Sequence, residues 1–406
     1  MKMKIALPWF RANGKSAIGS LAVLAVCFLM LVLAVGPALA GEEAGSKAQE
    51  KQEEELGFLE RPIGDNWVLS PVILPIYSPE TEFGLAIGGI ATFSTQPQNK
   101  DLPRSTITLV AIPSSSGAWG INADLEAFWL DDRLRTGIEG DFDTGPADYW
   151  GVGYEAGKNI EQDDDVTQYD RDIFELPLVA GLRISRSMFA GINFHLINMK
   201  VKEESATQAL DPHFQKYGDE ILNVGTGLRL LYDTRDDTLN AFSGVFFSVE
   251  ANAYRDWMGS DQEFETYSFD YRQYYQVKRP GRTIAWQVAG RQARGDVPWV
   301  SMSTVGGSRD LRGYSYGRFR DDASAFAQVE YRHMTDWKLW KIGRQGFAVW
   351  GGVGFIGEDF GDFGGHELPN AGVGYRVEVQ ERRNIRVDVG WGYDEVGLYL
   401  QFAEAF

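Results

Sequence analysis

Apolar and polar residues alternate along most of this chain with a period of two, and this alternation constrains the fold more than any other feature. It is clearest over residues 119–129, 371–379 and 385–391. In the last run Val387 and Val389 alternate with charged or small neighbours. Successive side chains of a β-strand point to opposite faces, so each run predicts a strand with one apolar and one polar face.

Two architectures fit such strands, and the lengths of the connections distinguish them. In a soluble sandwich the apolar faces would form a core, whereas in a membrane barrel they face lipid and the polar faces line the lumen. The connections divide into short turns and long polar loops, which is typical of a membrane barrel with its long loops outside the cell. We therefore predict an all-β fold, a transmembrane antiparallel β-barrel of about 16 strands with both ends on the periplasmic rim.

The strands and connections behind this prediction are as follows. Each expected strand has the ~10 residues that a tilted membrane crossing needs. The expected strands span 82–94, 103–112, 117–130, 133–143, 147–156, 174–184, 188–200, 221–232, 243–254, 265–277, 282–294, 323–334, 345–355, 369–379, 383–392 and 395–402. The short turns are 113–116, 185–187, 278–281 and 380–382, and the long loops are 157–173, 201–220, 295–322 and 356–368. Two connections on the short side, 233–242 and 335–344, are longer than this rule prefers.

Residues 1–40 have the features of a secretory signal peptide. A basic start precedes the apolar run Leu21–Val35 and Ala38–Ala40, which is an A-x-A cleavage site. A retained membrane anchor is the alternative, but the apolar run is short for one. Cleavage after Ala40 would leave 406 − 40 = 366 residues and remove the only cysteine, Cys27. Because residues 1–40 carry four basic and no acidic side chains, the net charge would change from −18 to −22, which argues against nucleic acid as a partner.

The rest of the chain divides into two parts. Residues 41–69 are polar and rich in Glu, Lys and Gln, which predicts a short periplasmic lead-in. Residues 70–406 are expected to form the barrel in the bacterial cell outer membrane.

The most specific motif lies in the longest connection, between the eleventh and twelfth expected strands. It consists of Gly306, Gly307, Leu311, Arg312, Gly313 and Tyr314. This segment resembles the BamA/TamA-type outer-membrane barrel family (the bacterial surface antigen family), whose sixth extracellular loop carries Gly-Gly followed by V/I/L-R-G-F/Y. Leu231–Asp236 matches a second family element, Y-D-T-R-D, at a turn between the eighth and ninth strands. The resemblance covers residues 70–406 and implies that the loop folds back into the lumen.

The resemblance also implies that Arg312 contacts lumen-facing residues of the next two strands. An arginine inside a barrel needs carboxylate partners, because an unpaired buried charge is costly. Glu330 is our first choice of partner, and Trp350 stands where the family has an aromatic residue. Gly352 stands where the family has an aspartate, so Glu378 or Asp388 is expected to compensate.

The final strand resembles a sorting signal. Its apolar face alternates with Tyr399, and aromatic residues follow at Phe402 and Phe406. A C-terminal amphipathic strand that ends in an aromatic residue resembles the signal that barrel-assembly machinery recognises. An ordinary edge strand is the alternative.

Two functional hypotheses follow. In the first, the protein is a barrel-only family member without POTRA modules, with a role in outer-membrane protein assembly or transport, and it acts on client polypeptides. In the second, it is a passive or gated channel or a structural surface protein, which the mixed charges of the lumen face also suit. We expect outer-membrane lipids and lipopolysaccharide as further partners. The four histidines are far apart in the sequence and show no H-E-x-x-H spacing, and no convincing set of catalytic residues is present, so we expect no enzyme activity, no cofactor and no metal site.

Overall fold

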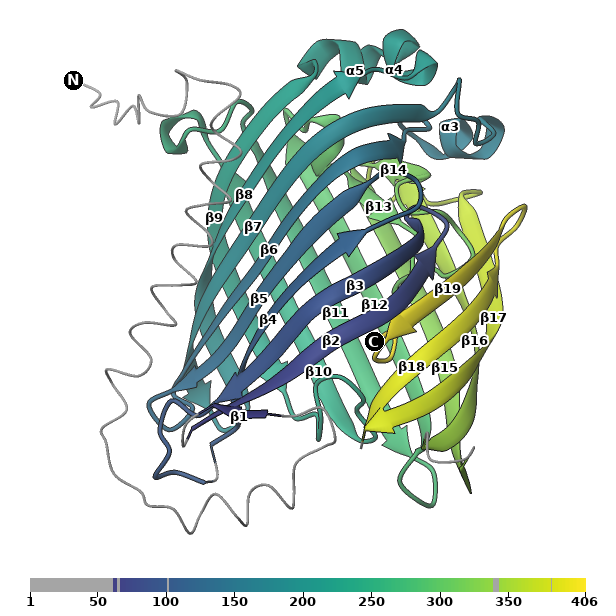
Figure 1. Ribbon diagram of the computed structural model, residues 1–406. Helices are drawn as coiled ribbons and strands as arrows, with labels where there is room; N and C mark the ends of the chain where they lie inside the picture. The colour runs from purple at the N-terminus through teal and green to yellow at the C-terminus, as the bar shows by residue number, and fades with distance from the viewer. Residues whose placement is uncertain (1–60, 64–65, 101, 339–342, 381) are drawn as a thin grey trace, which may run out of the picture.

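The computed structural model describes residues 61–63, 66–100, 102–338, 343–380 and 382–406. Within these ranges the chain is almost entirely β-structure (Figure 1). No helix among the described residues is long and apolar enough to cross a membrane. The predicted signal peptide, residues 1–40, lies outside the described residues, as does the lead-in as far as residue 60.

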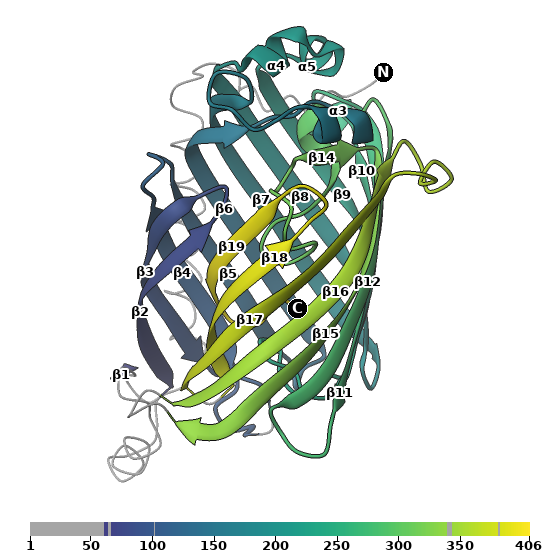
Figure 2. The ribbon, with the colours of Figure 1, turned by 90° about the vertical axis from the view of Figure 1, so that its right-hand side faces the viewer.

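Sixteen antiparallel strands close into one barrel, with each strand paired to the next in the chain and β19 returning to β2 (Figures 1 and 2). The barrel strands are β2 (Trp67–Ser78), β3 (Glu82–Phe93), β4 (Ser105–Pro113), β5 (Trp119–Trp129), β6 (Leu134–Asp148), β7 (Gln168–Ser185), β8 (Met188–Glu203), β9 (Glu220–Asp233), β10 (Gly244–Tyr254), β11 (Phe264–Gln276), β12 (Arg282–Gly295), β15 (Ala323–Lys338), β16 (Arg344–Gly357), β17 (Glu367–Gln380), β18 (Arg383–Trp391) and β19 (Val396–Phe402). The predicted fold class and strand number are therefore confirmed.

The strand number is correct because two errors in the individual strands cancel. The strand expected at 147–156 does not form, since β6 ends at Asp148 and Gly151 and Gly153 have φ values of 91° and 97°, which break an extended strand. The first barrel strand, β2, was missed because Pro71 and Pro75 interrupt its apolar run. Proline cannot donate to a sheet ladder and argues against a central strand.

The shift of strands also changes the rim on which the connection after β4 lies. Two rims are defined by their connections: the loop rim carries 149–167, 204–219 and 296–322, and the turn rim carries 186–187 and 234–243. The connection after β4 was expected among the short turns of the periplasmic rim. It lies on the loop rim instead, because β2 adds one crossing before it.

The short elements gather mainly at the two rims (Figure 2). At the loop rim, Tyr149, Phe214 and Trp299 pack together in a small apolar cluster that joins three loops. At the turn rim, the short strand β1 pairs with the first residues of β2. The short elements are α3 (Tyr154–Asn159), α4 (Ala206–Leu210), α5 (Pro212–Tyr217), β1 (Arg61–Ile63), β13 (Ser303–Val305), β14 (Phe319–Asp321) and the 3₁₀ turns Asp256–Met258 and Trp299–Ser301.

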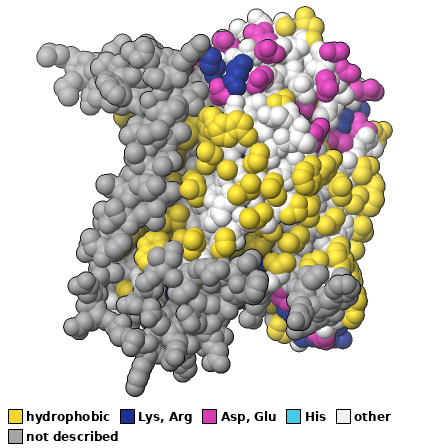
Figure 3. Space-filling model, in the orientation of Figure 1, with side chains coloured by type: hydrophobic (Ala, Val, Ile, Leu, Met, Phe, Trp, Pro, Cys, Tyr) yellow, Lys and Arg dark blue, Asp and Glu magenta, His cyan; other side chains and the backbone are white. Residues whose placement is uncertain are grey.

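The two faces of each strand differ as the alternation predicts. Ile192 and Leu228 project outward and are 62% and 69% exposed, whereas Asp388 is fully buried in the lumen. On the part of the outer wall that is visible in Figure 3, apolar side chains form a broad band, and charged side chains gather above it near the loop rim. Such a band suits lipid, and it leaves the polar groups of the lumen to pair with one another.

Candidate functional site

The connection 296–322 turns inward from the loop rim and occupies part of the lumen. It first forms the small hairpin of β13 and β14, and between them Gly306 and Gly307 turn the chain with φ values of 116° and 95°. Side chains rarely adopt such backbone conformations, so glycine is the residue that fits both positions. The prediction of a lumen-inserted loop between the eleventh and twelfth strands, β12 and β15, is confirmed.

Gly313 brings the backbone of this loop directly against the backbone of β18. Its φ is 115°, and a Cβ atom there would lie 2.7 Å from the main chain of Trp391 and Gly392. A Cβ atom on Gly390 would likewise lie 2.6 Å from the main chain of Arg312. The facing glycines thus allow the close approach that puts the Arg312 side chain among the strands.

Arg312 is completely buried and makes contacts on three sides. Its Nη1 donates to Asp388 Oδ2 at 2.7 Å, and its Nη2 donates to a carboxylate oxygen of Glu330. Its Cζ lies 3.6 Å from the centre of the Trp350 ring, and its carbonyl oxygen accepts a bond of 2.9 Å from Asn370. A planar guanidinium suits this arrangement, because it can pair with two carboxylates while an indole covers its face.

Four more charged side chains extend these pairs into a network, which we call the lumen ion cluster. Its members are Arg312, Glu330, Arg332, Arg376, Arg386, Asp388 and Glu404. Arg376 donates at 2.5 Å to Asp388 and at 2.9 Å to Glu404, and Arg386 donates at 2.5 Å to Asp388. With four guanidinium and three carboxylate groups, the charges almost balance, as buried ions require.

The other loop residues named from the sequence lie around this cluster. Leu311 is buried in an apolar group with Phe326 and Ile356. The Tyr314 hydroxyl donates to the carbonyl of Pro369 at 2.7 Å, and the Tyr399 hydroxyl accepts a bond of 3.0 Å from the Gly313 amide. The loop therefore touches β17 and β19 as well as β15, β16 and β18.

The structure explains why Gly352 stands where the family has an aspartate. A Cβ atom at this position would lie 2.7 Å from the carbonyl oxygen of Ala327 and 2.8 Å from the Asn370 amide oxygen, so an aspartate has no room. Asp388 supplies the second carboxylate for Arg312. Glu378 does not take part, because it binds Arg344 at 2.6 Å near the turn rim.

The sequence reasoning missed some members of the cluster. Arg332 and Arg376 lie on the polar faces of their strands, and this position could have indicated their pairing. Arg386 shares the polar face of β18 with Asp388, and only its two-residue spacing marks it as a partner. Glu404 lies beyond the last strand, where no alternation remains, so no sequence signal pointed to it.

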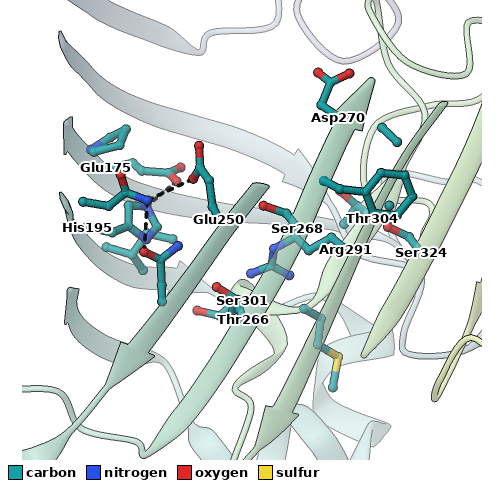
Figure 4. Close-up of a pocket in the computed structure, with 18 of the residues that line it drawn as sticks. Glu175, His195, Glu250, Thr266, Ser268, Asp270, Arg291, Ser301, Thr304 and Ser324 are labelled. Carbon is teal, nitrogen blue, oxygen red and sulfur yellow. Dashed lines mark hydrogen bonds and ion pairs between the residues drawn. The ribbon is translucent and has the colours of Figure 1, made fainter. Parts of the chain in front are cut away.

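The lumen also holds a polar chamber of about 500 Å³ between the wall β7–β12 and the loop (Figure 4). Glu175, Glu250 and Asp270 face it from the strands, and Arg291 lies among hydroxyl side chains. His195 bonds Glu175 at 2.7 Å through Nε2. Within the described residues, no group of three or more His, Cys, Asp and Glu side chains is arranged to hold a metal ion.

The comparisons with known proteins agree with this geometry. The Omp85 superfamily domain matches residues 125–393, and no curated protein matches the chain in sequence. BamA from Haemophilus ducreyi, in a structure lacking POTRA domains 1–3, shares the fold with a TM-score of 0.53 at 12% identity, over 82% of this chain and 70% of that one. CdiB from Escherichia coli matches with a TM-score of 0.55 at 11% identity, over 82% of this chain and 62% of that one. CdiB from Acinetobacter baumannii matches with a TM-score of 0.51 at 10% identity, over 83% of this chain and 60% of that one.

The chain thus spans less than two thirds of the length of either CdiB, and at these identities the likeness concerns the fold alone. The domain match is broader evidence of relationship, since it covers about two thirds of the sequence and contains the loop with Arg312. The predicted relationship to BamA/TamA-type barrels is confirmed, and the chain belongs to the Omp85 superfamily.

Proposed function

We propose that this protein acts in the bacterial outer membrane as an insertion or translocation barrel for client polypeptides, with the β19–β2 junction as its movable element. The observation that carries the proposal is the poor pairing of that junction. β19 and β2 are in register at one position only, Leu400 with Tyr77. By contrast, β18 and β19 pair continuously from Ile385–Phe402 to Trp391–Val396.

The sequence of β2 keeps its free edge from pairing further. Pro71 and Pro75 lack the amide hydrogen that a neighbouring strand would need. β1 covers the start of β2 by pairing Arg61–Ile63 with Trp67–Leu69. Residues 70–76 therefore have no register partner on this side among the described residues, which leaves an edge that a client strand can join.

The loop with Arg312 has a complementary role in this proposal. The lumen ion cluster ties β15, β17 and β18 together, so this side of the wall stays rigid while β2 moves away. We place the loop rim outside the cell and the turn rim in the periplasm. Lipids and lipopolysaccharide would surround the apolar band. During biogenesis Tyr399, Phe402 and Phe406 would serve as the signal for the barrel-assembly machinery.

Reconstitution into liposomes tests the proposal. The purified protein should speed the insertion of another unfolded outer-membrane barrel compared with empty liposomes. The matched control is the same preparation with Tyr77→Cys and Leu400→Cys joined by a disulfide, which should insert no faster than empty liposomes. Equal insertion with and without the disulfide would contradict a role for the junction.

The polar chamber of about 500 Å³ favours a second candidate, a gated channel or a structural surface protein. A channel would release small polar solutes from the same liposomes, and its conductance would be steady. We propose no enzymatic role, because members of this superfamily act as transporters and insertases.

A further inference from the structure

The chain leaves the barrel wall after β19 and turns into the lumen. Ala403 turns it with a φ of 65°, and its amide donates to the carbonyl of Asn384 at 2.8 Å. The next three residues, Glu404, Ala405 and Phe406, are all buried. We call Ala403–Phe406 the inturned segment.

The Glu404 carboxylate is bound by two donors from different strands. Arg376 of β17 donates through Nε to Oε2 at 2.9 Å, and Asn384 of β18 donates to Oε1 at 2.6 Å. Arg332 of β15 lies 3.7 Å from the same carboxylate. An acidic side chain at this point thus has both of its oxygens satisfied.

Phe406 is bound at its main chain and at its ring. Its main-chain oxygen accepts a bond of 2.7 Å from Arg332 Nη2, and the guanidinium carbon of Arg332 lies 5.0 Å from the ring centre. The ring packs in an apolar cup made by Ala241, Tyr274 and Ala285. These residues come from the connection 234–243, from β11 and from β12, so the cup is assembled by segments far apart in the sequence.

The two arginines that recognise the segment are also bound to residues outside it. Arg332 donates through Nε to Glu330 at 2.6 Å, and Arg376 donates through Nη1 to Asp388 at 2.5 Å. The donors thus have partners, Glu330 and Asp388, that do not belong to the inturned segment. Supporting partners of this kind are characteristic of a binding site, since they reduce the order that has to be gained on binding.

The turn rim also provides a route into this site. The connection 234–243 crosses beneath the lumen, where Asp236 pairs with Arg382 at 2.5 Å and Asp237 pairs with Arg383 at 3.0 Å. These pairs are partly exposed to solvent, and exposed ion pairs are weak. Because Ala241 belongs to the same connection, displacement of this connection would open the cup toward the turn rim.

We propose that the turn-rim half of the lumen contains a binding site for acidic–aromatic peptide segments, which the chain's own residues Ala403–Phe406 occupy. The site binds a carboxylate through Arg376 and Asn384. It binds an aromatic residue two positions later through Arg332 and the apolar cup. This inference goes beyond the proposed function and holds whether or not the protein inserts clients.

A peptide-binding experiment tests the proposal. The peptide Ala-Glu-Ala-Phe, labelled with fluorescein at its N-terminus, is titrated with detergent-solubilised protein, and its fluorescence anisotropy is measured. A variant that ends at Phe402 should bind the peptide saturably, whereas the full chain should bind it at least ~10-fold more weakly because its own segment competes. Peptides with Gln for Glu or Ala for Phe should each bind the shortened variant ~10-fold more weakly.

Two further variants control for the possibility that shortening the chain impairs folding. The full-length double variant Glu404→Gln with Phe406→Ala keeps the chain length but weakens its own occupancy, so it should also bind the peptide. Ala285→Phe in the shortened variant fills the cup and should abolish binding. The proposal is overturned if heat-modifiable, folded barrels of the shortened and double variants fail to bind, or if they bind all the peptides equally.

Discussion

The β15–β18 wall and the β19–β2 junction are built in opposite ways. In the wall, long strand pairs are reinforced from inside by the lumen ion cluster, whose central residues are fully buried. At the junction, Leu400 and Tyr77 form the single register pair, and no buried ion pair crosses it among the described residues. A closed barrel can therefore combine one stiff sector with one weak boundary, because its polar interior can be concentrated on one side.

One contact at the loop rim connects the two regions. Glu80, in the turn between β2 and β3, accepts a bond of 2.7 Å from the amide of Tyr316, which follows the Arg312 motif. The loop thus touches both sides of the junction at this rim. Opening is expected to start from the turn rim, where β2 is covered by β1 rather than by β19.

The largest expected effect is that of removing the central cation from the stiff sector. Arg312→Ala should destabilise the barrel by about 3 kcal/mol, the lower end for a broken buried pair, because Glu330 and Asp388 keep other arginine partners. The unfolding temperature read from heat-modifiable gel mobility measures this loss. Arg312→Lys keeps the positive charge but not the planar guanidinium that pairs with two carboxylates, so its unfolding temperature should lie between those of the parent and Arg312→Ala. If Arg312→Ala has the same unfolding temperature as the parent, the wall is not stiffened by this residue.

The second test joins the weak boundary covalently. A disulfide between Tyr77→Cys and Leu400→Cys should abolish the acceleration of client insertion, and reductant should restore it. The control is a disulfide between Val387→Cys and Leu400→Cys, which are register partners in the well-paired β18–β19 ladder. If both disulfides inhibit equally, the junction has no special role.

A smaller effect separates the cation–π contact from the ion pairs. Trp350→Leu should destabilise the barrel by about 1–2 kcal/mol, because the Arg312 guanidinium loses the indole at 3.6 Å. Trp391→Leu is the matched control, since Trp391 faces outward and is 45% exposed. Equal unfolding temperatures for the two variants would show that the indole adds nothing beyond its bulk.

The smallest effect concerns the contact that connects the two regions. Burial raises the pKa of Glu80 above its usual range, although the Tyr316 amide opposes this shift. A carboxyl group with a raised pKa adds stability at low pH and loses it as the pH rises through the folded pKa. Glu80→Gln should therefore unfold at a slightly higher temperature than the parent at pH 8 and at the same temperature near pH 4. A constant difference across this range would contradict a burial-shifted carboxyl group.

The sequence predicted the barrel and its loop because both depend on local patterns. Alternation fixes which residues face lipid, and the glycines around Arg312 mark a loop that must approach a strand closely. The pairing of Glu330 with Arg312 was expected from the resemblance and from the cost of an isolated charge.

What could not be predicted depends on contacts between distant segments or on residues outside the alternation. β2 was missed because its prolines, which would weaken a central strand, are tolerated at a free edge. The role of Glu404 depends on a turn at Ala403 that no pattern marks. The crowding at Gly352, which excludes the family's aspartate, arises from Asn370 on the next strand and becomes visible only in three dimensions.

Amide hydrogen exchange, followed by mass spectrometry on the reconstituted barrel, tests the central contrast most directly. Residues 70–76 of β2 should exchange much faster than residues 371–378 of β17 and 385–390 of β18, since a free edge opens locally while the stiff sector opens only with global unfolding. Similar protection in both regions would contradict a barrel that has one stiff sector and one weak boundary.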